Sequence, residues 1–174
     1  MLLHDMADKF NAVSDQLPLP DQIRPDPALS EILDDEVRHL ASLLAFLAGE
    51  SAFRHRTATR YPLPATRYPA TVTVRRTTLA LASAAEPAGL ALAALGAAVH
   101  RLGQLSGLAH QAPGPARSRA LTIEHQRLVD CLGDSRIHLA RTARRLRTAA
   151  DTRTPPAATA MPAPSTPIAP SRSR

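Results

Sequence analysis

The stretch that decides the fold runs from Arg117 to Ala150 and reads RSRALTIEHQRLVDCLGDSRIHLARTARRLRTAA. Alternating steps of four and three residues through it meet one recurring set of positions: Leu121, His125, Leu128, Leu132, Ser135, Leu139, Thr142 and Leu146. A repeat close to 3.5 residues forms a single stripe only on a helix. The sequence therefore predicts a long amphipathic helix with a leucine face.

Arginines occupy the other side of this predicted helix. On a helical wheel, five of them point away from the leucine stripe: Arg119, Arg127, Arg141, Arg144 and Arg145. The helix should therefore present leucine to a neighbouring helix and arginine to solvent or to an anion.

The composition suits an all-α protein. The 174 residues are enough for one domain of ordinary size. The apolar content comes mostly from alanine and leucine, with no tryptophan, three phenylalanines and two tyrosines. Such a mixture favours close-packed helices, whereas a sheet would be richer in β-branched and aromatic residues.

A second long helix is predicted after Asp26 and Pro27, because aspartate caps free backbone amides and proline suits the first helical turn. The same four-three spacing continues through Leu33, Val37, Leu40, Leu44 and Leu47, and Leu29, Ile32, Leu43 and Phe46 widen the apolar face. This helix is expected to end between Gly49 and Arg56.

A third long helix is predicted from about Thr71 to Ala109. Its four-three phase continues unchanged through Pro87, and a turn there would have no reason to preserve it. One helix kinked at Pro87 is therefore favoured over two antiparallel helices. The expected fold is an antiparallel bundle of three long helices, with a short N-terminal helix as a fourth.

The domain organisation follows from these segments. Residues 1–25 form an N-terminal arm with a short amphipathic helix, which either docks on the body, exchanges onto a neighbour or frays. Residues 26–150 form the bundle, with a proline-rich connector at 57–70. Residues 151–174 hold six prolines and no aromatic residue, which predicts a disordered tail.

The connector contains a direct repeat, because ATRYP occurs at 58–62 and again at 65–69. Prolines in both copies favour an extended chain. The repeat presents an arginine and a tyrosine twice, which could stack on nucleic-acid bases. Replication slippage tolerated in a loop explains the same repeat without a function.

Charge is distributed unevenly along the chain. Residues 1–50 carry ten acids and three bases, whereas residues 51–174 carry five acids and eighteen bases. One hypothesis is that the acids of the first long helix lie beside the arginines of the last and neutralise them; these acids are Glu31, Asp34, Asp35 and Glu36. The other is that the arginines bind nucleic acid.

Several features favour a cytoplasmic protein. Cys131 is the single cysteine, so no disulfide can form within the chain, and the N-terminus lacks the basic and apolar regions of a signal peptide. Residues 77–99 are long enough to span a bilayer. Their alanine content, Glu86 and Pro87 make them a poor membrane span, so no membrane association is expected.

No enzymatic function, cofactor or metal is expected. Glu36 and His39 have the i, i+3 spacing of a Glu-x-x-His metal motif, but no second copy accompanies them. Cys131 and the serines lack the neighbouring signatures of a nucleophile, and the glycines occur singly rather than in a phosphate-binding loop.

Two functional hypotheses remain. The first is a helical interaction or scaffold protein that binds itself, for example as a homodimer, or a helical protein partner through the leucine stripe at Leu128, Leu132, Leu139 and Leu146. The alternative is nucleic-acid binding through Arg136, Arg141, Arg144, Arg145 and Arg147, together with Arg60, Tyr61, Arg67 and Tyr68 of the connector. The salt dependence of binding distinguishes the two hypotheses, because phosphate contacts weaken steeply as salt rises and apolar contacts do not.

Overall fold

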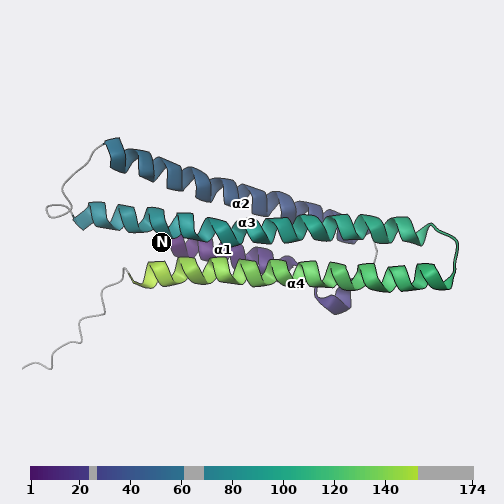
Figure 1. Cartoon of the computed structure of the whole chain (residues 1–174). Helices are drawn as coiled ribbons and strands as arrows, with labels where there is room; N and C mark the ends of the chain where they lie inside the picture. The colour runs from purple at the N-terminus through teal and green to yellow at the C-terminus, as the bar shows by residue number, and fades with distance from the viewer. Residues whose placement is uncertain (24–26, 61–68, 153–174) are drawn as a thin grey trace, which may run out of the picture.

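The computed structural model describes residues 1–23, 27–60 and 69–152, and nearly all of these residues are helical (Figure 1). The described part of the chain contains no strand, so the all-α prediction is confirmed. The elements in chain order are α1 (Leu2–Gln16), the short 3₁₀ helix η1 (Pro20–Gln22), α2 (Pro27–Arg60), α3 (Pro69–Ala109) and α4 (Pro115–Asp151).

Consecutive long helices run antiparallel, and α3 lies between α2 and α4 (Figure 1). The short helix α1 packs mainly against α4 and also touches α2. Four helices therefore surround one core over part of the length. Past the N-terminal end of α2, toward the turn between α3 and α4, the bundle consists of these two helices alone (Figure 1).

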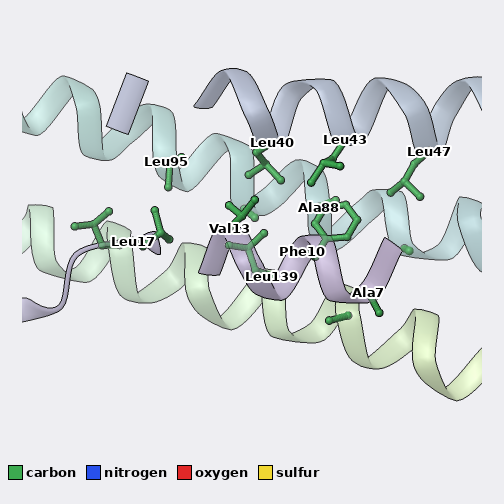
Figure 2. Close-up of a cluster of buried hydrophobic side chains, with 14 of the residues drawn as sticks. Ala7, Phe10, Val13, Leu17, Leu40, Leu43, Leu47, Ala88, Leu95 and Leu139 are labelled. Atoms are coloured by element: carbon green, nitrogen blue, oxygen red, sulfur yellow. The ribbon is translucent and has the colours of Figure 1, made fainter. Parts of the chain in front are cut away.

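Helix α1 is part of the core. The side chains of Leu3, Met6, Phe10 and Val13 are at most 2% exposed. Phe10 and Val13 point among leucines and alanines of the other three helices (Figure 2). The predicted N-terminal helix is confirmed, and it docks on its own chain rather than fraying.

Helix α3 runs unbroken through Pro87, as the four-three phase predicted. Proline has no amide hydrogen, so the carbonyl of Ser83, four residues earlier, lacks its helical donor. The Arg145 Nη1 of α4 donates to this carbonyl oxygen at 2.6 Å and to Glu86 Oε2 at 3.0 Å. A side chain from the neighbouring helix thus replaces the hydrogen bond that the proline removes.

We expect Arg145→Met to lower the free energy of unfolding by about 1 kcal/mol, the usual net contribution of one hydrogen bond. In a Pro87→Ala background the loss should be smaller, because the new amide can donate to the Ser83 carbonyl. Urea unfolding of the two single variants and the double variant measures this coupling. Arg75→Met is the control, because Arg75 is exposed and has no partner among the described residues. Equal losses in both backgrounds would show that Arg145 does not compensate for the missing proline amide.

Helix α2 is longer than predicted, since it ends at Arg60 rather than between Gly49 and Arg56. No proline occurs between Pro27 and Pro62, and a single glycine costs only about 1 kcal/mol in a helix. The last turns are also supported locally, because Arg54 Nε lies 2.9 Å from Glu50 Oε2 and Thr57 donates to the Phe53 carbonyl. Part of the predicted connector, including the first three residues of the first ATRYP copy, is therefore helical.

The remaining connector residues, 61–68, lie outside the described residues, as do Asp26 and residues 153–174 of the predicted tail. Helix α2 begins at Pro27 as expected, and α4 ends at Asp151.

Candidate interaction surfaces

The leucine stripe of α4 faces inward. Its four predicted partner-binding residues, Leu128, Leu132, Leu139 and Leu146, are at most 1% exposed and belong to the core formed with the other helices. Ser135, on the same stripe, donates a hydrogen bond to the Ala91 carbonyl of α3 at 3.2 Å. At these four leucines the stripe is therefore covered by the chain's own helices, whereas Leu121 and His125, nearer the start of α4, are only half-buried.

Three of the five α4 arginines predicted to bind nucleic acid are used within the chain. Arg136 donates to the Leu17 carbonyl and so fixes the end of α1 on α4. Arg145 donates to the Ser83 carbonyl and to Glu86 beside Pro87 of α3. Arg147 Nη2 lies 2.8 Å from Asp8 Oδ1 of α1.

The other two, Arg141 and Arg144, are exposed and form no ion pair or hydrogen bond with any described residue. Arg60, at the end of α2, is also exposed and unpaired within the described part of the chain. Tyr61, Arg67 and Tyr68 lie outside the described residues. The structure thus brings together only part of the arginine set that the sequence suggested.

The acids of α2 do not neutralise α4, which corrects the expected pairing. Asp35 instead pairs with Arg38 of its own helix at 2.8 Å. The acids that reach α4 are Asp8 of α1 and Glu86 of α3. The reason is topological, because α4 packs against α1 and α3, whereas α2 packs against α3 and α1.

Glu36 is a buried acid on α2. Its Oε2 has no hydrogen-bond partner, and His39 Nδ1 lies 3.8 Å away. Burial raises the pKa of the Glu36 carboxyl, and the neighbouring His39 opposes that shift only in part. Within the described residues, no three histidine, cysteine, aspartate or glutamate side chains gather closely enough to hold a metal ion.

Cys131 is a partly buried free thiol, and burial raises its pKa above the ordinary value. A raised pKa reduces the thiolate fraction at neutral pH, and the thiolate is the reactive form. Cys131 therefore lacks the lowered pKa that activates a cysteine as a nucleophile.

Large apolar side chains also point outward at regular intervals. On α2 the exposed ones are Ile32, Phe46 and Phe53, with exposed fractions of 45%, 45% and 61%. Their spacings are fourteen and seven residues, so they form a second stripe beside the buried one, which we call the α2 outer stripe. Helix α4 repeats the pattern with Ile123 and Ile137, fourteen residues apart and both about half exposed.

A hollow of about 390 Å³ lies between α4 and the α1–α2 connection. Pro20 and Ile23 form one wall, and Val129 and Ile137 contribute to the other. Asp130 and Asp134 lie at the same hollow, so its lining combines apolar surface with two carboxyl groups. Arg136 also lines it, but it donates to the Leu17 carbonyl and forms no ion pair with either carboxyl group. This combination suits the aliphatic stem and cationic head of an arginine side chain.

By length and composition alone, one helical segment of the described chain, Val72–Ala109, could cross a membrane. It belongs to α3, which packs between α2 and α4, and the central helix of a packed bundle has the same composition.

No family model, curated protein or solved structure matches this chain.

Proposed function

We propose that this chain is a non-enzymatic helical scaffold protein that acts by helix association, and that it associates with a second copy of itself. One observation carries the proposal. After the inner stripes are filled, large apolar side chains remain exposed on the outer faces of the long helices, at multiples of seven residues on α2 and α4. A heptad spacing is the pattern through which one helix packs against another.

The cost of exposure supports this proposal. Full burial of a large apolar side chain contributes about 1.5 to 3 kcal/mol, and these side chains, which are about half exposed, forgo part of that free energy. Scattered exposed residues are ordinary on protein surfaces, but regular spacing along one helical face indicates a face that becomes covered.

The test is the molar mass in solution, measured by light scattering on the full chain after nuclease treatment, at low and at high salt. We expect a mass above that of the monomer under both conditions, because apolar association is not abolished by salt. A monomer at every concentration tested would overturn the proposal.

Nucleic-acid binding is the second candidate, favoured by the exposed unpaired arginines where α2 ends, α3 begins and α4 ends. These are Arg56, Arg60, Arg75, Arg76, Arg141 and Arg144, and no described residue pairs with any of them. The same preparation, titrated with a fluorescent DNA duplex, discriminates the two functions. Binding at low salt that disappears steeply at high salt would support this candidate. No binding at low salt would remove it.

A further inference from the structure

The outward face of α4 carries opposite charges on the two sides of Ile137. Asp130 and Asp134 precede it, Arg141 and Arg144 follow it, and all four are exposed. None of the four forms an ion pair with another described residue, although Asp130 accepts a hydrogen bond from the Gln126 amide at 2.9 Å. Four charges on one face are therefore left without an ionic partner.

The four charges are arranged almost symmetrically along the helix. Asp130 lies seven residues before Ile137 and Arg144 seven residues after it. Asp134 lies three residues before it and Arg141 four after it. A twofold axis through such a face would pair each position before Ile137 with the equivalent position after it on a second, antiparallel helix.

In that arrangement Ile137 meets Ile137 of the partner subunit at the axis. Asp130 then lies opposite Arg144 of the partner subunit, and Asp134 lies beside Arg141 of the partner subunit. The twofold axis repeats both contacts, so one interface contains four ion pairs around an apolar centre. Such complementarity fixes the register and orientation of the two helices.

The surface beside Ile137 permits a close approach. Gly133 and Ala140 lie four residues before it and three after it. A Cβ added at Gly133 would meet no atom within 4 Å, so nothing in the chain fills the space there. Small side chains at such positions allow two helix axes to approach more closely.

The hollow next to Asp130 and Asp134 provides a contact surface for an arginine of the second copy. An arginine that reaches these carboxylates can lay its aliphatic stem against Ile23 and Val129. In the antiparallel arrangement, the arginines of the second copy arrive at this position.

From these observations we infer that two copies of the chain form a twofold-symmetric dimer through the outer face of α4, centred on Ile137. This inference rests on the proposed self-association and assigns it to a surface. The α2 outer stripe is the competing surface, but its charges are partly used already, because Arg38 pairs with Asp35 and Arg54 with Glu50.

Charge reversal on the full-length protein tests the inference. The variant Asp130→Arg with Asp134→Arg makes the face entirely basic, and Arg141→Asp with Arg144→Asp makes it entirely acidic. We expect each variant to be folded by circular dichroism and to dimerise at least roughly 100-fold more weakly than the wild type, because like charges then face each other across the axis. Mixed in equal amounts, the two variants should form a heterodimer with the mass of the wild-type dimer.

The control is Arg56→Asp with Arg75→Asp, which changes the net charge as much as the acidic variant does. Both arginines are exposed and unpaired among the described residues, and both lie on helices other than α4, so the wild-type dimer mass is expected. Dimers of unchanged strength in both α4 variants, or a mixture that stays monomeric, would overturn the inference.

The outcomes separate this inference from the proposed function. A wild-type monomer would remove both. A wild-type dimer that survives the α4 reversals but dissociates on Phe46→Asp with Phe53→Asp would keep the self-association and transfer it from α4 to the α2 outer stripe.

Discussion

Phe10→Ala is expected to lower the free energy of unfolding by about 3 to 5 kcal/mol, the range for removing a buried phenylalanine from a core. Phe10 is fully buried although it lies on the short N-terminal helix. It points toward Leu43 of α2 and Ala88 of α3 (Figure 2). The loss would leave a cavity between helices that are far apart in the sequence. Urea or thermal unfolding followed by circular dichroism measures the change.

Phe53→Ala is the matched control, because it removes the same atoms from a side chain that is 61% exposed. Its effect on the free energy of unfolding should lie within about 0.5 kcal/mol. Similar losses at the two positions would show that α1 does not complete the core.

Leu139→Asp should destabilise the protein by more than about 4 kcal/mol, because it removes a core leucine and buries a carboxylate without a partner. Leu139 is fully buried and lies beside α1 in the core (Figure 2). Since domains are commonly stable by only about 5 to 15 kcal/mol, a large unfolded fraction at 25 °C is expected. The helical signal in circular dichroism and the elution volume on gel filtration report this fraction.

Ile123→Asp provides the comparison on the same helix, because Ile123 is 51% exposed. Measured at a protein concentration at which the chain is monomeric, it should remain folded and change the free energy of unfolding by about 0.5 kcal/mol or less. A well-folded Leu139→Asp variant would contradict the assignment of the leucine stripe to the interior.

Periodicity alone predicted most of the fold. The four-three spacing identifies most of the buried positions of each helix, although Ile32 and Phe46 of the predicted α2 apolar face are 45% exposed. Pro87 lies within a single helix, as the unbroken phase indicated. The sequence predicts an end of α2 between Gly49 and Arg56, whereas the helix continues to Arg60 because alanine, arginine and the Glu50–Arg54 pair sustain it.

The candidate surfaces were harder to predict. Periodicity shows that a helix buries one face, but it does not say which neighbour covers that face. The α4 leucines therefore had two explanations, a partner or the chain itself, and only the packing distinguishes them. Arg141 and Arg144 look the same as Arg145 and Arg147 in the sequence, and they differ because α1 and α3 contact only the second pair. The heptad spacing of Ile32, Phe46 and Phe53 was the signal that could have revealed the outer stripe.

The number of helices around the core decreases along the molecule. Four helices surround it where α1 is present, whereas the far end consists of α3 and α4 joined through Pro113 and Gly114 (Figure 1). Each residue in the two-helix part can bury less of its surface, so local opening there costs less free energy than opening near Phe10. Amide hydrogens should therefore exchange with solvent fastest toward the α3–α4 turn and slowest beside α1. The two-helix end of the bundle would then open locally without unfolding of the four-helix end.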